Sequence, residues 1–316
     1  MKPIVALPFR HQAGLMCQEA RQMLMDAGFE LLCNETGDRL PREEQKAMIA
    51  DAFAVIAGTE KYDEDMLSAA KNLKVVIRFG VGTDNFDLEA MRSRGIAVGV
   101  IANYNSVAEF ALTLLLGMIK NLPKFDATVR EGKWTRYPMR ELSGKTVGIV
   151  GFGRIGRRLG QLLKGFDVNL MVHDPFMPAD AISDFGATPA TLEQLLQQSD
   201  VVSLHLPATP ATHHMMNAET LGLMKPGAYL VNTSRGALID EKALYDALVS
   251  GKLSGAALDV YETEPVVKGN PLFDLDNIVL APHVSAMSFE TNYNGGIICA
   301  QSIISVLNGG KPVYPI

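Results

Sequence analysis

Short β-branched runs separated by stretches with helical spacing constrain the fold of this chain more than any other feature. Five runs fall within the first hundred residues, at 3–8, 29–33, 53–58, 74–79 and 96–100. Six more follow an irregular connection that ends at Ser143-Gly144, at 146–150, 168–174, 200–207, 228–234, 255–260 and 277–283. Strands that alternate with helices form parallel sheets covered on both faces. The pattern predicts an α/β protein with two doubly wound parallel sheets.

Two domains are expected because the alternation stops and then restarts. The second domain begins near Asn103 with a long helix at about 106–122, whose apolar face suggests packing between domains or against a second subunit. A last helix at about 288–307 can cross back to the first domain. The predicted division is residues 1–101 and 288–316 for one domain and residues 102–287 for the other.

Composition narrows the class of protein. A chain of 316 residues can bury two cores, and its formal net charge of −6 argues against a general role on nucleic acid or membrane surfaces. A small anionic substrate needs only local positive charge. The longest apolar run, 110–119, is too short to span a bilayer, and the N-terminus lacks a signal-peptide pattern. We expect a cytoplasmic protein that binds neither nucleic acid nor membrane.

Neither the cysteines nor the histidines have the spacing of metal ligands. Cys17, Cys33 and Cys299 are far apart and odd in number, which favours free thiols in a reducing compartment. Adjacent His213-His214 would make a poor chelating pair. No metal site is expected.

A glycine motif predicts a dinucleotide site in the second domain. Gly151, Gly153 and Gly156 follow the run 146–150 and open a helix. The first glycine permits a tight turn, the second lets the backbone approach a pyrophosphate, and the third lets the helix pack on the strand. The pyrophosphate would then lie at the positive end of the helix, within reach of Arg154.

Asp174 ends the next run, 18 residues beyond Gly156, where a carboxylate would accept hydrogen bonds from the adenosine ribose. The same charge would repel a 2′-phosphate, and Pro175-Phe176 supplies no arginine to bind one. This favours NAD over NADP. Alternatively, Asp174 is a turn former at the end of a strand, before a proline.

Polar residues follow several other runs, where the carboxyl ends of parallel strands bind ligands. These are Pro207, Arg235, Glu262 or Glu264, and His283. Singly, Arg235 could be a solvated turn residue, Glu264 a loop charge and His283 a histidine with ordinary partners. Together a cation, an acid and an imidazole favour a site that binds a charged substrate and moves a proton.

Five segments carry a resemblance to a known family. GFGRIG (151–156), VNTSRGALID (231–240), LDVYETEP (258–265), APH (281–283) and RFGVGTDNFD (78–87) are similar to signatures of the D-isomer-specific 2-hydroxyacid dehydrogenases, in their phosphoglycerate dehydrogenase-like branch. The resemblance covers essentially the whole chain. It implies a Rossmann-type cofactor domain, a flavodoxin-like split substrate domain, and a homodimer formed through the long helix and the loop with Trp134.

The resemblance also implies roles in an NAD-linked dehydrogenase. Arg235 would bind the substrate carboxylate, and His283 would be the acid in reduction and the base in oxidation, with Glu264 hydrogen-bonded to it. Backbone groups of Val81-Gly82 would donate hydrogen bonds to the same carboxylate. Further contacts with the cofactor are expected at Ile155, Pro207, Thr212, Thr233 and Asp259, of which Asp259 would bind the nicotinamide amide.

Substrate identity stays open among 3-phosphoglycerate, glyoxylate or hydroxypyruvate, and larger 2-oxo acids. Arg10, Lys61 and Arg78 could bind a second anionic group, or they could be ordinary loop charges. Phosphoglycerate relatives usually carry an arginine near Ala57-Gly58, and many relatives carry an aromatic residue and a threonine where Met287-Ser288 lies here. Glu264 replaces the glutamine of the formate-oxidising branch, which argues against formate.

Two other functions are compatible with these residues. Corepressors that resemble the family keep the same three residues, so an NAD(H)-sensing interaction protein is one alternative. The other is oxidation of an unusual hydride donor such as phosphite.

Overall fold

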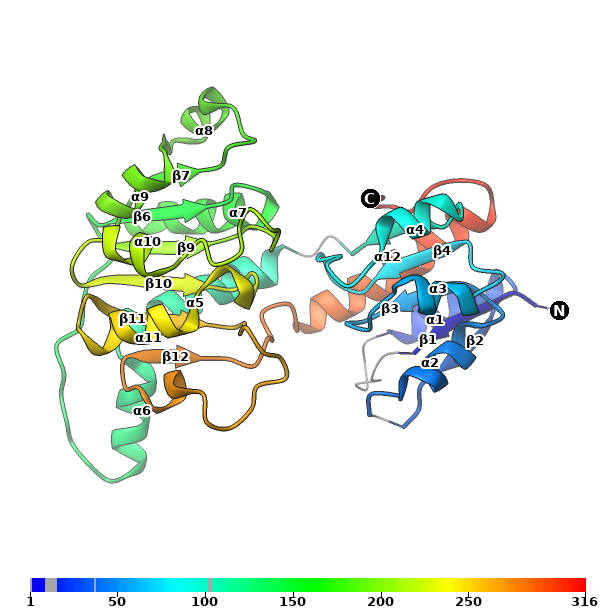
Figure 1. Ribbon diagram of the computed structural model, residues 1–316, viewed down its shortest axis with the longest axis horizontal. Coiled ribbons are helices and arrows are strands. Elements are labelled where there is room, and N and C mark those ends of the chain that lie inside the picture. Colours follow the sequence, from blue (N-terminus) through cyan, green and yellow to red (C-terminus); the bar gives the residue numbers. More distant parts are fainter. Residues whose placement is uncertain (1, 9–15, 37, 102–103) are drawn as a thin grey trace. The chain divides into compact units, whose positions relative to one another are not determined.

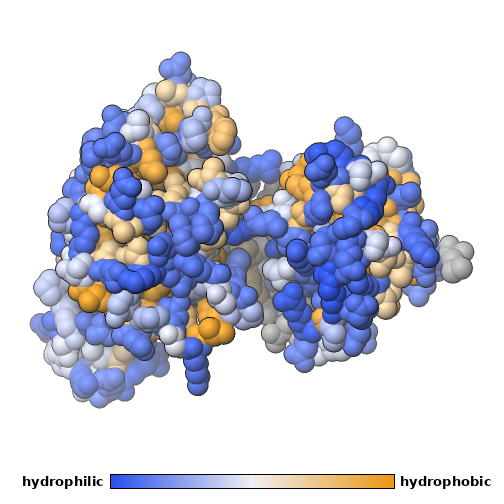
Figure 2. Space-filling model, viewed as in Figure 1, coloured by the Kyte–Doolittle hydropathy of each residue, from blue (hydrophilic) through white to orange (hydrophobic). Residues whose placement is uncertain are grey.

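The computed structural model describes residues 2–8, 16–36, 38–101 and 104–316, and they form two units (Figure 1). Unit 1 comprises Met1–Asn103 and Ala286–Ile316, and unit 2 comprises Tyr104–Ser285. Each unit contains a parallel sheet with helices on both faces, which confirms the predicted fold class. On the face drawn in Figure 2, hydrophilic residues predominate on both units.

Unit 1 has a five-stranded sheet in the order β2-β1-β3-β4-β5, which is the flavodoxin-like order. Its strands are β1 (Ile4–Leu7), β2 (Glu30–Cys33), β3 (Ala52–Ala57), β4 (Val75–Arg78) and β5 (Ala97–Val100). Its helices are α1 (Gln18–Asp26), α2 (Arg42–Ile49), α3 (Glu64–Ala69), α4 (Leu88–Ser93) and α12 (Phe289–Leu307). Helix α12, from the end of the chain, packs beside α1 and β4 (Figure 1).

The period of two along the strands divides the core of unit 1 between the two faces of the sheet. In β3, Ala54 and Ile56 pack with residues of α1 and α12. Val55 and Ala57 face the other way and pack with residues of α2, α3 and α4. Because both faces are covered, the strands contain almost no polar residue.

Unit 2 has a seven-stranded sheet in the order β12-β11-β10-β9-β6-β7-β8. Its strands are β6 (Thr146–Val150), β7 (Asn169–His173), β8 (Thr188–Pro189), β9 (Val201–Leu204), β10 (Ala228–Asn232), β11 (Leu253–Leu258) and β12 (Ile278–Leu280). The chain runs outward from β6 in both directions, so the switch in strand order lies between β6 and β9. Ligands of doubly wound sheets bind outside the carboxyl ends of the strands at such a switch.

Helices cover both faces of this second sheet. One face carries α9 (Leu192–Gln198), α10 (Ala218–Leu223) and α11 (Glu241–Val249). The other carries α5 (Asn105–Ile119), α7 (Arg154–Leu163) and α8 (Ala179–Phe185). The remaining elements of unit 2 are α6 (Leu122–Arg130) and the 3-10 turns η1 (Lys164–Phe166), η2 (Gly236–Leu238) and η3 (Pro271–Asp274).

The helix predicted at 106–122 is shorter than expected. Helix α5 ends at Ile119, Asn121 adopts φ 51°, and Pro123 lies in the first turn of a separate helix, α6. Proline in a first turn favours a new helix start over continuation. The buried face of α5 packs on α7 and on β10, β11 and β12 of its own unit. The buried residues of the helix therefore pack within unit 2, and contact of the helix with a second subunit stays a prediction.

Two further features of unit 2 were not predicted. Helix α6 falls in the stretch after the expected long helix, and β8 has only two residues, too few to show a hydrophobic period.

Among the described residues no single helix is long and apolar enough to cross a membrane. The pair α5 and α6 reaches that length and composition together but bends by 62° between them.

Candidate active site

The glycine motif forms the turn from β6 into α7. Gly151 has φ +91°, and a Cβ atom there would lie 2.4 Å from the His205 carbonyl oxygen. A Cβ at Gly156 would lie 2.2 Å from the Gly151 carbonyl oxygen. These two positions therefore require glycine because of the protein's own packing.

Gly153 differs, because a Cβ atom there would meet no atom within 4 Å. It is exposed and is the N-cap residue of α7, and as a glycine it has no side chain to accept from the first backbone N–H groups. Those donors and the open space beside them fit a pyrophosphate, which would need the backbone to stay bare. Arg154 is exposed at the same helix start, and Ile155 is half-buried.

Asp174, just after β7, connects its turn with the glycine motif. Its Oδ1 atom accepts a hydrogen bond from the Phe176 N–H at 2.9 Å, and its Oδ2 atom accepts one from the Phe152 N–H at 2.7 Å. The first bond is the local turn contact that the alternative interpretation required. Each carboxylate oxygen keeps a second lone pair, and the side chain is only partly buried. The carboxylate can thus form the turn and still accept ribose hydroxyl groups.

The loop after β9 carries Pro207 and Thr212. The Thr212 hydroxyl donates to the Pro207 carbonyl oxygen at 2.8 Å and accepts from the Thr209 N–H at 2.8 Å, which closes the loop on itself. At the start of this loop, His205 Nε2 lies 2.8 Å from Ser203 Oγ. Burial lowers the pKa of His205 to about 4, so this ring is neutral near pH 7.

Thr233 supplies a buried hydroxyl group just after β10. Its Oγ1 atom is inaccessible to solvent and has no hydrogen-bond partner among the residues that the structure describes. A buried hydroxyl without a partner costs free energy. Thr233 therefore fits the predicted contact with a polar group of a cofactor.

Arg235 follows β10 in a segment held by neighbouring polar groups. The Asn232 side chain donates to the Arg235 carbonyl oxygen at 2.8 Å and accepts from the Ser234 N–H at 2.9 Å. Arg235 Nη1 donates to the Ser234 carbonyl oxygen at 2.7 Å. A Cβ atom at Gly236 would lie 1.9 Å from the Tyr261 carbonyl group. Only glycine lets the Arg235 segment approach the segment that leads to Glu264.

Glu264 and His283 are brought together from the loops after β11 and before α12. The His283 Nδ1 and Glu264 Oε2 atoms are 2.6 Å apart, and Glu264 Oε1 accepts from the Tyr261 N–H at 3.0 Å. Burial acts to raise the pKa of the Glu264 carboxyl group. The hydrogen bond and charge of His283, the Tyr261 N–H and nearby Arg235 outweigh burial and lower that pKa. An ionised Glu264 accepts a hydrogen bond from Nδ1 and so keeps Nδ1 protonated. Nε2 is then the ring nitrogen that can exchange a proton with a substrate.

His283 lies in a backbone conformation that Asp259 maintains. The residue has φ 54°, in the left-handed region that residues other than glycine rarely adopt. Its N–H donates to the Asp259 carbonyl oxygen at 2.7 Å. The fully buried Asp259 carboxylate accepts from the Val284 N–H at 2.8 Å and the Ser285 N–H at 2.9 Å. Asp259 thus holds both sides of His283, and its contact with nicotinamide stays a prediction.

The predicted substrate contacts Val81 and Gly82 lie in unit 1, in the loop after β4. The Arg78 guanidinium shapes this loop by donating to the Gly82 carbonyl oxygen at 3.1 Å and the Phe79 carbonyl oxygen at 2.8 Å. Lys61 Nζ lies 3.6 Å from Asp63 Oδ2. Arg10 lies outside the described residues. Val81 itself is exposed.

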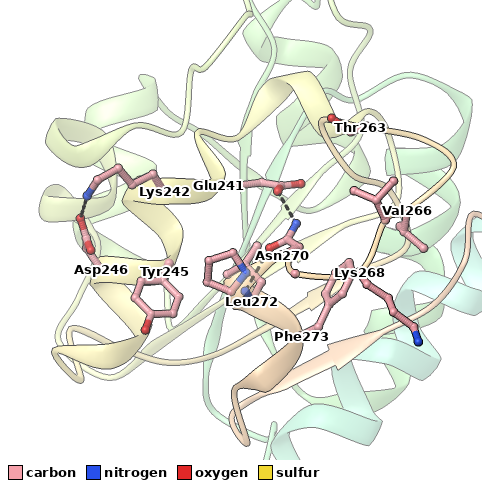
Figure 3. A pocket seen from close by; sticks show the side chains of 13 residues that line it. Glu241, Lys242, Tyr245, Asp246, Thr263, Val266, Lys268, Asn270, Leu272 and Phe273 are labelled. Carbon is pink, nitrogen blue, oxygen red and sulfur yellow. Dashed lines mark hydrogen bonds and ion pairs between the residues drawn. The ribbon is translucent and has the colours of Figure 1, made fainter.

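A cavity of about 520 Å³ opens in unit 2 between α11, η3 and the loop that carries Glu264 (Figure 3). None of the predicted site residues lines it. No role was predicted from the sequence for Gly236, Asn232 or Ser234. Of these three residues, only Gly236 carried a usable signal, because a glycine next to the polar end of a strand can indicate that another backbone segment lies close by.

Comparisons with known proteins assign these motifs to one family. A family model described as "D-isomer specific 2-hydroxyacid dehydrogenase, NAD binding domain" matches residues 112–285. The chain is 36% identical over 314 residues to a D-3-phosphoglycerate dehydrogenase of Archaeoglobus fulgidus, covering 98% of this chain and 58% of that protein. It is 40% identical over 264 residues to a glyoxylate reductase of Korarchaeum cryptofilum, covering 80% of this chain and 79% of that protein.

A solved structure of a glyoxylate reductase from Paecilomyes thermophila superimposes with a TM-score of 0.87 at 29% identity, covering all of this chain and 98% of that one. Length separates the two kinds of relative. The chain spans 58% of the length of the phosphoglycerate dehydrogenase of Archaeoglobus fulgidus and 53% of the length of that of Methanocaldococcus jannaschii.

Proposed function

Because the chain belongs to the D-isomer specific 2-hydroxyacid dehydrogenase family, we propose that it is an NAD-dependent oxidoreductase that interconverts a 2-oxo acid and a D-2-hydroxy acid. The Glu264–His283 pair, with 2.6 Å between carboxylate and imidazole, is the observation that carries the proposal. It lies at the same edge of the sheet as Arg235 and the glycine motif.

The residues divide the work of the reaction. Bound NAD(H) supplies or accepts the hydride at its nicotinamide ring. His283 Nε2 donates a proton to the carbonyl oxygen during reduction and accepts it during oxidation. Arg235 binds the substrate carboxylate, and Glu264 holds the imidazole and offsets its positive charge.

Cofactor binding is proposed for unit 2, and substrate contacts are proposed for unit 1 in addition to Arg235. Gly151, Gly153 and Gly156 with the start of α7 would hold the pyrophosphate, and Asp174 the adenosine ribose. The remaining proposed contacts with the cofactor are Arg154, Ile155, Pro207, Thr212, Thr233 and Asp259. Backbone groups of Val81 and Gly82 are proposed to donate hydrogen bonds to the substrate carboxylate. The proposed location is the cytoplasm.

The contacts of Arg78 favour a short substrate. A phosphorylated substrate needs a cation for its second anionic group. Among the described candidates, Arg78 directs its guanidinium to backbone carbonyl oxygens, Lys61 Nζ lies 3.6 Å from Asp63 Oδ2, and Ala57-Gly58 offers no cation. Glyoxylate or hydroxypyruvate is therefore the preferred proposal over 3-phosphoglycerate.

A panel of 2-oxo acids tests this function. NADH oxidation by the purified protein would be followed with glyoxylate, hydroxypyruvate, pyruvate, phosphohydroxypyruvate and branched analogues. We expect the highest kcat/KM with glyoxylate or hydroxypyruvate. A clear preference for phosphohydroxypyruvate would overturn the substrate assignment alone. No turnover of any of these acids by a protein that binds NADH would overturn the proposed reaction.

A homodimer is proposed as the assembly. Helix α6 buries none of its residues within the chain. Leu122, Val129, Trp134 and Met139, in α6 and the segment after it, are each more than half exposed, with Trp134 at 81%. Large apolar side chains gathered on one segment are typical of a surface that a second subunit covers.

A further inference from the structure

The segment from Glu262 to Asn270, here called the acid loop, carries Glu264 from β11 to η3. Its residues from Glu262 to Gly269 are all exposed. Behind them lies the cavity of about 520 Å³, bounded by Tyr245 of α11 and Phe273 of η3 and by Val266 and Val267 of the loop itself (Figure 3). Apolar packing therefore gives the middle of the loop little support.

Two carboxylates hold the ends of the acid loop to the start of α11. Glu241 Oε1 accepts from the Glu262 N–H at 2.8 Å, and Glu262 Oε1 accepts from the Glu241 N–H at 2.8 Å. Glu241 Oε2 accepts from Asn270 Nδ2 at 2.6 Å, a contact drawn in Figure 3. Glu241 thus reaches both ends of the loop, and Glu262 satisfies a backbone donor that the helix start leaves without an intrahelical partner.

The same carboxylates connect the acid loop with a second loop of the candidate site. His214 Nε2 lies 3.2 Å from Glu262 Oε1. His214 directly follows the loop that Thr212 closes, and its backbone N–H donates to the Ala237 carbonyl oxygen at 2.8 Å. Glu262 is therefore held from two sides, two residues before Glu264.

We propose that Glu241 and Glu262 are positioning residues that fix the acid loop and thereby keep the Glu264 carboxylate on His283. The inference rests on the proposed function, in which Glu264 orients the imidazole. Neither glutamate needs to touch substrate or cofactor. A loop that lies over a cavity and loses this clamp gains conformational freedom, and misplacement of a group by about 1 Å can cost a hundredfold in rate.

The test compares kcat and KM of four single variants in NADH-dependent reduction of the best 2-oxo acid. Glu241→Ala removes both loop contacts, and Glu241→Gln keeps an oxygen that can accept from the Glu262 N–H. Asp246→Ala is the matched control, because it breaks the ion pair with Lys242 on the same helix, 2.7 Å long, and leaves both contacts of Glu241 with the acid loop in place. Glu264→Gln measures how much kcat depends on the Glu264–His283 pair itself. Glu262→Ala replaces Glu241→Ala if the latter does not fold.

We expect Glu241→Ala to lower kcat roughly tenfold or more while KM for NADH stays within about twofold. Glu241→Gln should recover most of the loss, and Asp246→Ala should keep wild-type kcat. Combining Glu241→Ala with Glu264→Gln should lower kcat little below Glu264→Gln alone, because the two act through one group.

Additive losses in the double variant would overturn the inference, because Glu241 would then act elsewhere. Equal kcat for Glu241→Ala and Asp246→Ala, with a clear loss in Glu264→Gln, would overturn it and leave the proposed function intact. Unchanged kcat in Glu264→Gln would remove the role of Glu264 and the inference with it.

Discussion

Asp174 and Asp259 are carboxylates at strand ends that each accept two backbone N–H bonds, yet their surroundings give them different uses. Asp259 is fully buried, and its two bonds hold the chain on the far side of His283. Asp174 is partly exposed, and one of its bonds holds Phe152 of the glycine motif while the other closes its own turn at Phe176. We infer that Asp259 acts mainly on the protein, whereas Asp174 is available to a ligand.

Replacing Asp174 tests the proposed preference for NAD. Asp174→Asn keeps an oxygen for one backbone N–H but removes the negative charge that would repel a 2′-phosphate. Loss of one charge-assisted hydrogen bond costs about 1.5–3 kcal/mol, so NADH affinity should fall roughly tenfold to a hundredfold. Discrimination against NADPH should shrink. Titrations of both cofactors measure this, and an unchanged preference would place the ribose contact at another residue.

The lowered pKa of Glu264 predicts a stability change in acid. A carboxyl group whose pKa is lower in the folded state contributes stability above its ordinary pKa of 4.5 and loses that contribution as the pH falls through the folded value. Glu264→Gln lacks this titration. The Tm advantage of the wild type over Glu264→Gln should therefore be present at pH 6 and shrink between about pH 5 and 3. An advantage that grows toward acid would contradict the assignment.

At the scale of elements, the pattern of apolar runs was sufficient for the strands because both sheets are covered on both faces. Eleven of the twelve strands found among the described residues coincide with predicted runs. The exceptions have physical reasons: β8 is two residues long, and the break between α5 and α6 depends on a left-handed Asn121 before a proline. Hydrophobic periodicity in a sequence indicates which face of a helix or strand is buried. It does not indicate where a helix ends or which element the buried face packs against.

The candidate site was predicted less completely. Chemical type and position at strand ends indicated Arg235, Glu264 and His283, and the family resemblance supplied their proposed roles. The contacts that position them involve backbone groups, such as the bonds from Val284 and Ser285 to Asp259 and the close approach of Gly236 to Tyr261. Such contacts follow from tertiary packing, which local patterns do not encode.

Glycines in two turns should respond differently to alanine. Gly236→Ala should destabilise the fold by about 1–3 kcal/mol, because its Cβ atom would overlap the Tyr261 carbonyl group. Gly153→Ala should change stability by no more than about 0.5 kcal/mol but weaken NADH binding, because its methyl group would enter space reserved for the pyrophosphate.

Gly165→Ala is the matched control for both variants, because its Cβ atom also meets nothing within 4 Å and it lies in η1, outside the candidate site. Denaturant unfolding and NADH titration distinguish the cases. Equal NADH affinity in Gly153→Ala and Gly165→Ala would contradict the proposed pyrophosphate position.

At the scale of the whole molecule, the proposed dimer accounts for the exposed apolar segment after α5. Sedimentation should give about twice the chain mass of 34.3 kDa. Leu122→Asp with Val129→Asp should shift the protein toward monomer, since both side chains are more than 60% exposed within the chain. Phe176→Asp, at another exposed apolar position, serves as control. A monomeric wild type would exclude the dimer and leave the chemistry unaffected.

The most direct test of the proposed function is the turnover of His283→Ala, measured together with its NADH affinity. Removing the imidazole takes away the proton donor but none of the groups proposed to hold the cofactor. We expect kcat with the preferred 2-oxo acid to fall by a factor of at least about 100, with the Kd for NADH within about threefold of wild type. Wild-type turnover in His283→Ala would contradict the account.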